Sequence, residues 1–123
     1  MSLRIEGAWK SFVHDGTAQS VLRNVDLTVE PGQFVSLIGH SGCGKSTLVR
    51  ALGGLLELDA GQISLDGKPI TGPGPDRAMV FQHYSLLPRL SLVDNVRAAV
   101  RSARPDKGKA AADEAAERYL TAV

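Results

Sequence analysis

The first part of the chain alternates between hydrophobic and polar residues, which is typical of β-strands with one buried face. Residues 3–9 alternate with a period of two, and residues 21–30 do so again. Residues 10–18 between them are polar and predict a loop. Pro31 and Gly32 follow the second run, and this pair favours the turn that ends a strand.

Other apolar runs are continuous, which indicates strands buried on both faces. Residues 34–38 and 78–81 are runs of this kind. Residues 62–65 predict a further short strand, and Asp66 and Gly67 directly after it predict a hairpin turn.

Helical spacing of hydrophobic residues marks three further segments. Residues 46–55 place leucines on one face, and two glycines near their end weaken the helix there. Ser91 is followed by an acid three residues later, which predicts the N-cap of a helix over residues 92–103, and Pro105 ends that helix. Residues 112–123 repeat apolar residues opposite charged ones and predict a last helix. Strands and helices together predict an α/β fold.

A glycine-rich sequence between the apolar run at 34–38 and the helix at 46–55 fits the phosphate-binding pattern G-x-x-x-x-G-K-(S/T). Its glycines allow backbone N–H groups to turn toward a phosphate chain. Lys45 would place a positive charge near the β- and γ-phosphates, and Ser46 would offer a hydroxyl to Mg²⁺. The alternative, a glycine-rich turn that binds nothing, does not require a strand before it and a helix after it. The predicted nucleotide-binding residues of this loop are Gly39, His40, Ser41, Gly42, Cys43, Gly44, Lys45, Ser46 and Thr47.

Composition narrows the class of protein. With 43% hydrophobic and 22% charged residues, the chain is typical of a soluble globular protein. A net charge of +1 gives no electrostatic basis for binding nucleic acid. We find no secretory signal and no apolar run of about 20 residues that would span a bilayer. These features predict a cytoplasmic protein.

Cys43 is the single cysteine, which excludes an internal disulfide and fits a reducing compartment. Inside the loop, Lys45 and the backbone amides would favour its reactive thiolate. The alternative is a small residue that merely fits the turn, because only its backbone N–H is needed there.

With the phosphate loop, Phe81 and Gln82 in view, the chain resembles the nucleotide-binding subunit of an ABC transporter. Residues 72–77 (GPGPDR) and the YSLLP sequence that begins at Tyr84 are similar to importers of nitrate, sulfonate and taurine, and nearest to the nitrate type. Arg89 departs from the tryptophan usual there, which leaves the substrate open. The resemblance implies a P-loop NTPase core with an antiparallel β-subdomain and the start of a helical subdomain.

The resemblance also implies a site for ATP and Mg²⁺. Phe12 matches the aromatic that stacks on adenine, and Gln82 matches a glutamine that reaches Mg²⁺ or the attacking water. Lys45 and Gln82 are then the expected catalytic residues, and Ser46 and Gln82 the expected metal ligands. Without the resemblance, Phe12 would be taken for a core or edge-strand aromatic, and Gln82 for a solvated residue at the end of a strand.

Partners follow from the family in the same way. Residues 84–92, from Tyr84 to Leu92, would dock on a transmembrane permease subunit, because exposed apolar residues suit an interface. A solvated surface loop is the alternative for this segment. The family further implies a second nucleotide-binding subunit, indirect contact with a solute-binding protein, and a peripheral location at the cytoplasmic face of the cell membrane.

The sequence of 1–123 matches only the first part of such a nucleotide-binding domain. We find no Leu-Ser-Gly-Gly signature and no apolar strand that ends in Asp-Glu. Asp113 and Glu114 are the single Asp-Glu pair, and they lie on the solvated face of a predicted helix. The chain is therefore expected to bind ATP, as the energising subunit of an importer of a small oxyanion, without hydrolysing it alone.

Other functions stay open at this point. A non-transport ABC ATPase and a non-catalytic nucleotide-binding or regulatory module are both compatible with the phosphate loop. A small GTPase is disfavoured, since the sequence has neither D-x-x-G after its second strand nor a later N-K-x-D.

Overall fold

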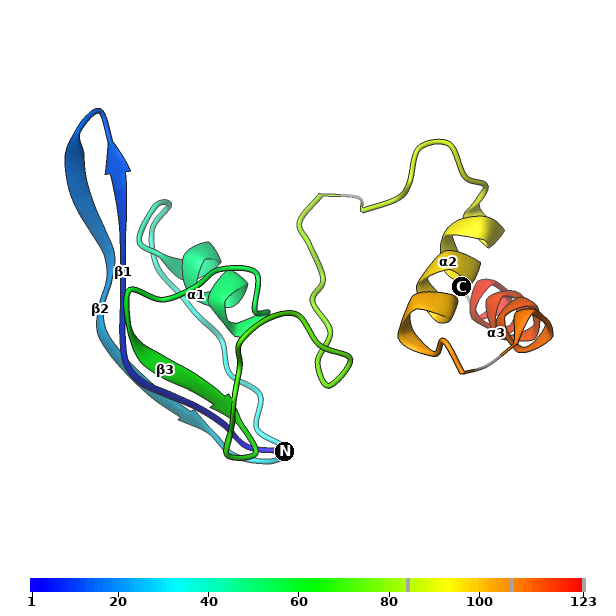
Figure 1. Cartoon of the computed structure of the whole chain (residues 1–123), viewed down its shortest axis with the longest axis horizontal. Helices are drawn as coiled ribbons and strands as arrows, with labels where there is room; N and C mark the ends of the chain where they lie inside the picture. The colour runs from blue at the N-terminus through cyan, green and yellow to red at the C-terminus, as the bar shows by residue number, and fades with distance from the viewer. Residues whose placement is uncertain (84, 107, 123) are drawn as a thin grey trace. The chain divides into compact units, whose positions relative to one another are not determined.

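A computed structural model describes residues 1–83, 85–106 and 108–122, and the chain divides into two compact units, Met1–Ala78 and Met79–Val123 (Figure 1). The first unit contains β1 (Leu3–His14), β2 (Thr17–Val29), α1 (Lys45–Leu52), β3 (Ala60–Leu65) and β4 (Lys68–Pro69). The second contains α2 (Leu92–Ala103) and α3 (Lys109–Thr121). No helix in these described residues is both long enough and apolar enough to cross a membrane.

The sheet of the first unit is antiparallel, with the strand order β2-β1-β3-β4. Its longest part is the β1–β2 hairpin, which is visible as two long neighbouring strands in Figure 1. Asp15 and Gly16 make its turn with φ angles of 48° and 73°, the left-handed pair that a two-residue hairpin turn needs. The prediction of a loop over residues 10–18 was therefore wrong. This tight turn lets the polar residues on either side of it stay paired.

The core of the first unit lies between the sheet and α1. Its buried residues come from both layers and are Ile5, Ala8, Leu22, Leu48, Ala51 and Ile63. The helix predicted over residues 46–55 is confirmed, although it ends earlier, at Leu52. Gly53 and Gly54 follow at once, and Gly54 has a φ of 71°, so the weakening effect of these glycines is also confirmed.

The strands predicted over residues 34–38 and 78–81 are absent from the described structure. Their side chains are exposed instead: Phe34, Ile38 and Val80 are 93%, 95% and 97% exposed. An apolar run becomes a buried strand only if neighbouring strands pair with it and cover its faces. No strand in the described part of the chain pairs with either segment, which is why both predictions fail here.

The hairpin turn predicted at Asp66 and Gly67 is confirmed. It joins β3 to the short β4, and the two residues have φ angles of 48° and 75°. The Asp66 carboxylate also accepts a hydrogen bond from the backbone amide of Ser2, 2.7 Å away, which ties the turn to the residue before β1.

The second unit contains two helices in contact, and the first of them, α2, is capped at its N-terminus as predicted. The Ser91 hydroxyl accepts a hydrogen bond from the Asp94 amide at 3.1 Å and donates one to the Asp94 carboxylate at 2.6 Å. This hydroxyl, and then Arg97, lowers the pKa of Asp94. The helix ends at Ala103, two positions before Pro105. The predicted N-cap and the predicted stop are both confirmed.

Helix α3 packs on α2 through small residues, since Ala112 and Ala116 are its buried residues. The expectation that Asp113 and Glu114 are both solvated was wrong for Asp113. Its Oδ1 lies 2.7 Å from Nε of Arg97 on α2, so this carboxylate joins the two helices, whereas Glu114 is exposed. The Asp94 and Asp113 carboxylates together raise the pKa of Arg97.

Candidate functional site

The glycine-rich loop of residues 39–47 leads directly into α1, and its conformation depends on glycine. Gly42 and Gly44 have φ angles of 80° and 99°, which L-residues with side chains rarely adopt. Gly44 is also buried, and a Cβ atom there would lie 2.9 Å from the carbonyl oxygen of Val21 in β2. A side chain at this position is therefore excluded both by the backbone conformation and by the neighbouring strand.

The N-terminal end of α1 presents unpaired backbone donors. Its first backbone hydrogen bond runs from the Leu48 amide to the Gly44 carbonyl oxygen, over 2.9 Å. The amides of Lys45, Ser46 and Thr47 precede that bond and have no acceptor within the helix. Neither a capping side chain nor an acidic residue occupies this first turn. The helix end thus offers free N–H groups and the positive end of its dipole, which together favour an anion.

The Lys45 side chain folds back toward the start of the loop. Its Nζ donates to the carbonyl oxygens of Gly39 and His40, 2.5 and 2.7 Å away. The exposed Cys43 thiol lies 3.5 Å from the same nitrogen. The His40 ring makes a local contact, in which Nδ1 lies 2.9 Å from the Ser41 carbonyl oxygen. The loop therefore gathers one cation, free amides and an accessible thiol within a few residues.

Phe12 lies on the β1–β2 hairpin, opposite Gln19, and its side chain is 42% exposed. It is not one of the core residues, so its ring has surface available for contact. Two residues earlier, Lys10 is paired with Leu22, and Leu22 packs beside Gly44 of the loop. The same hairpin thus carries the aromatic and borders the phosphate loop.

Gln82 belongs to the second unit, whereas Phe12 and the loop of residues 39–47 belong to the first. It lies exposed in an irregular segment after Phe81. The structure therefore brings together two of the three predicted parts of the site within one unit. Gln82, the third part, lies in the second unit.

The segment predicted to dock on a permease begins at Tyr84, which lies outside the described residues. The remainder exposes several leucines: Leu86 and Leu87 are each 53% exposed, and Leu92 is 63% exposed. Leu90 is 41% exposed. These apolar side chains lie close together in the sequence and are accessible.

Asn95 organises this segment, and sequence reasoning missed it. Its Oδ1 accepts a hydrogen bond from the Leu87 amide at 2.7 Å. Its Nδ2 donates to the carbonyl oxygens of Leu87, Leu90 and Ser91, at 3.3, 3.2 and 3.0 Å. An asparagine in the first turn of a helix, shortly after a run of leucines, was the available signal.

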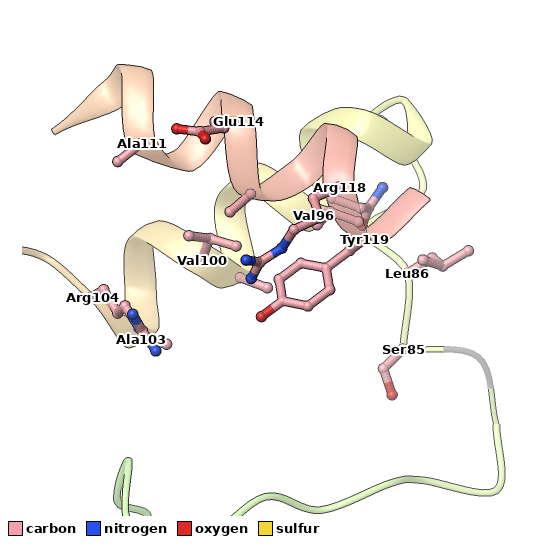
Figure 2. Close-up of a pocket in the computed structure, with 13 residues that line it drawn as sticks. Ser85, Leu86, Val96, Val100, Ala103, Arg104, Ala111, Glu114, Arg118 and Tyr119 are labelled. Atoms are coloured by element: carbon pink, nitrogen blue, oxygen red, sulfur yellow. The ribbon is translucent and has the colours of Figure 1, made fainter. Parts of the chain in front are cut away.

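A groove of about 830 Å³ adjoins the same segment within the second unit (Figure 2). Val96 and Val100 of α2 and Tyr119 of α3 supply apolar surface, and Leu86 borders the groove from the leucine-bearing segment. Arg104 and Arg118 are among its charged lining residues. The groove is amphipathic, because its apolar lining is accompanied by these two cations and by the anionic Glu114.

The model of the family described as "ABC transporter" matches residues 22–123. The chain belongs to the ABC transporter family. The predicted resemblance is thereby confirmed.

Curated relatives of this ABC family member are named as ATP-binding proteins of nitrate import and of bicarbonate transport. It is 45% identical over 102 residues to the nitrate import ATP-binding protein NrtD of Synechococcus elongatus, with 83% of this chain and 37% of the relative covered. It is 43% identical over 121 residues to the bicarbonate transport ATP-binding protein CmpD of Synechocystis sp., with 98% and 43% covered. The chain thus spans about two fifths of the length of these relatives.

Solved structures of ABC cassettes have the same fold. One is a dimeric post-hydrolysis state of the ATP-binding cassette MJ0796 bound to ADP and Pi, with a TM-score of 0.83 and 25% identity. That match covers 97% of this chain and 56% of the other. A second dimeric structure of the MJ0796 cassette gives a TM-score of 0.71 at 25% identity, covering 82% of this chain and 47% of the other. The predicted α/β class and the P-loop NTPase fold of this ABC family member are confirmed.

The site of this ABC family member fits a metal carried by a ligand better than a metal held by protein alone. The described residues contain no group of three or more His, Cys, Asp or Glu side chains that could hold an ion. Ser46 has an exposed hydroxyl next to the free helix amides. Mg²⁺ commonly takes one or two protein oxygens and completes its shell with water and phosphate oxygens, which suits this donor set.

Proposed function

We propose that this chain binds MgATP at residues 39–47, as the phosphate-loop part of an ATP-binding subunit that energises an importer of a small oxyanion. The observation that carries the proposal is the geometry around Gly44. A buried glycine in a left-handed conformation turns the chain so that the loop ends on unpaired helix amides.

Each loop residue then has a defined contribution. The amides of Gly42 and of Gly44 to Thr47 hold phosphate oxygens, and Lys45 neutralises charge at the β- and γ-phosphates. Mg²⁺, when bound, supplies Lewis-acid stabilisation of the phosphate oxygens. Ser46 would hold it through the hydroxyl, and Gln82 is the further proposed ligand through its amide oxygen.

The base would stack on Phe12. Its ring is accessible and lies on the hairpin that borders the phosphate loop. Stacking on an aromatic face is tolerant of base identity, so this contact adds affinity and little discrimination among purines.

We propose binding rather than turnover for the 123-residue polypeptide. Lys45 can neutralise charge and Gln82 can orient a water, and these are their proposed catalytic roles. Efficient phosphoryl transfer also needs a base or water-positioning acid, and the single Asp-Glu pair of the sequence lies within α3 and not at the end of a strand. A second nucleotide-binding subunit would face the bound nucleotide in the complete machine.

The transported ion and the docking partner are proposed from the relatives. Nitrate and bicarbonate, which appear in the names of the two relatives above, are both small oxyanions. The exposed leucines at 86, 87 and 90 and the adjoining groove are the proposed contact for a permease subunit at the cytoplasmic face of the membrane. A solute-binding protein would act upstream of that permease.

Calorimetric titration of the chain with MgATP, MgADP and MgGTP tests the proposal. Saturable binding of MgATP that Lys45→Ala abolishes is expected. Lys68→Ala, which changes an exposed lysine on β4, is the control that should bind normally. Equal binding by the Lys45→Ala chain would overturn the proposed site. A parallel hydrolysis assay should show no turnover that depends on Lys45.

A further inference from the structure

Asp59 holds β1 at the point where its backbone pairing with β3 ends. The last pair between these strands is Trp9 with Ala60, and the Asp59 amide donates to the Trp9 carbonyl oxygen at 2.9 Å. Beyond this point, the Asp59 carboxylate accepts hydrogen bonds from β1 in place of a neighbouring strand. Its Oδ2 accepts from the Ser11 amide at 2.6 Å, and its Oδ1 accepts from Lys10 Nζ at 2.7 Å.

This carboxylate also fixes a cation beside Phe12. The Lys10 side chain is only 15% exposed, and its ammonium group pairs with the Asp59 carboxylate. Lys10 Nζ lies 5.7 Å from the centroid of the Phe12 ring, within the range of a cation–π contact. The hydrogen bond from Lys10, followed by that from the Ser11 amide, lowers the pKa of Asp59 below its ordinary value.

On its other edge, β1 pairs irregularly with β2 at these same residues, Lys10 and Ser11. The register with β2 shifts between Lys10 and Ser11, which leaves Val21 as the extra residue of a bulge in β2. The Val21 carbonyl oxygen is the atom that closes the space next to Gly44. Asp59 therefore binds Lys10 and Ser11 of β1, the same two residues that face the β2 bulge beside the phosphate loop.

We propose that Asp59 is a positioning residue for the nucleotide base. It sets the direction of the part of the β1–β2 hairpin beyond the bulge, residues 11–20, which we call the arm. The direction of the arm in turn sets the position of Phe12 relative to the phosphate loop. This inference rests on the proposed function, since it takes the base to stack on Phe12. A base-free polyphosphate would use the loop alone, whereas ATP would use the loop and the arm. Asp59 should consequently matter for ATP and not for tripolyphosphate.

The test compares the affinities of MgATP and magnesium tripolyphosphate for the same chain by calorimetry. Asp59→Ala should bind MgATP about tenfold more weakly, the loss expected when one base–aromatic stack is released. Its affinity for tripolyphosphate should be unchanged. Phe12→Ala should show the same selective loss of MgATP affinity. A chain with both Asp59→Ala and Phe12→Ala should bind MgATP no more weakly than Phe12→Ala alone, because both changes remove the same contact, the stack of the base on Phe12.

Two further variants separate positioning from general stability. Asp59→Asn keeps an acceptor oxygen but removes the charge that pairs with Lys10, and it serves if Asp59→Ala does not fold. Asp66→Asn is the matched control, because Asp66 also binds a backbone amide, that of Ser2, at the opposite end of β1. It should bind both ligands normally.

The outcomes are distinct for the two proposals. If Asp59→Ala, or Asp59→Asn where the alanine variant does not fold, weakens both ligands equally, or neither, the positioning role is overturned and the nucleotide site stands. If the unaltered chain binds neither MgATP nor tripolyphosphate, the proposed function itself fails. If it binds tripolyphosphate as tightly as MgATP, the base makes no contact and the role of Asp59 falls with that of Phe12.

Discussion

The carbonyl oxygen of Val21 closes the space beside Gly44, so that a Cβ on this glycine would come within 2.9 Å of it. The contact joins the β2 bulge to the last residue before α1. A change at Gly44 would therefore disturb the strand and the phosphate loop together.

Gly44→Ala should lose MgATP binding and should also lower the free energy of unfolding. The left-handed conformation alone costs a non-glycine residue about 1–2 kcal/mol, and the clash with Val21 adds to it. Chemical denaturation and calorimetric titration would measure the two effects.

The control for this change is Gly16→Ala in the β1–β2 turn. Gly16 also has a positive φ, of 73°, but a Cβ there would meet nothing within 4 Å. It should show the conformational cost without the loss of binding. If the two variants behaved alike, the contact with Val21 would have no specific role.

Cys43 offers a chemical probe of the loop. Its thiol is exposed, lies 3.5 Å from Lys45 Nζ, and is the single cysteine of the chain. Alkylation with iodoacetamide, followed by mass spectrometry, should modify one site and weaken MgATP binding. Saturating MgATP should slow the reaction, whereas adenosine, which has no phosphates, should not. Equal labelling rates in all three conditions would place the nucleotide elsewhere.

Ser91→Ala should destabilise α2 by about 1 kcal/mol, because it removes the acceptor for the Asp94 amide. The loss should be measurable as a lower midpoint in denaturation followed by circular dichroism. Ser102→Ala is the matched control, since Ser102 is an exposed serine within the same helix. A loss of the same size in Ser102→Ala would argue against a capping role.

The same cap predicts a response to acid. The pKa of Asp94 is lowered, first by the Ser91 hydroxyl and then by Arg97. A carboxylate whose pKa is lower in the folded state contributes stability above its ordinary value, here 3.8, and loses that contribution as the pH falls below it. Ser91→Ala should therefore reduce the acid dependence of the stability of α2 below pH 3.8. An unchanged slope in stability against pH would contradict this.

Asn95→Ala should loosen the leucine-bearing segment before α2. The change removes the acceptor for the Leu87 amide and the donors to Leu87, Leu90 and Ser91. Hydrogen exchange of the Leu87 amide should become faster. Asn95→Asp keeps an acceptor oxygen and should protect that amide better than alanine does. If both variants exchange at the unaltered rate, the side chain does not hold the segment.

Local signals predicted the helices and the capped ends well. The serine at 91 with an acid three residues later, and the glycines after Leu52, act through neighbours in the sequence, so the sequence displays them directly. The two Asp-Gly turns show the limit of prediction from such local signals. The turn after β3 follows a clear apolar strand, whereas that at Asp15 lies between residues exposed on both sides, where no alternation marks the strands.

Features that depend on distant residues were not predictable in this way. The runs at 34–38 and 78–81 have strand composition, but a strand exists only where another pairs with it. The Asp59 carboxylate accepts a hydrogen bond from the Ser11 amide, 48 positions away in the sequence. Only the register of the sheet reveals that the two residues meet.

The exposed run around Phe34 and Ile38 affects how the protein behaves in solution. It combines β-branched and aromatic residues with unpaired backbone groups, which is the composition that lets separate copies add strand to strand. Self-association should therefore grow with concentration and compete with folding. Binding constants measured in dilute solution, with light scattering alongside, will report on the phosphate loop, whereas those measured in concentrated solution will also report on aggregation.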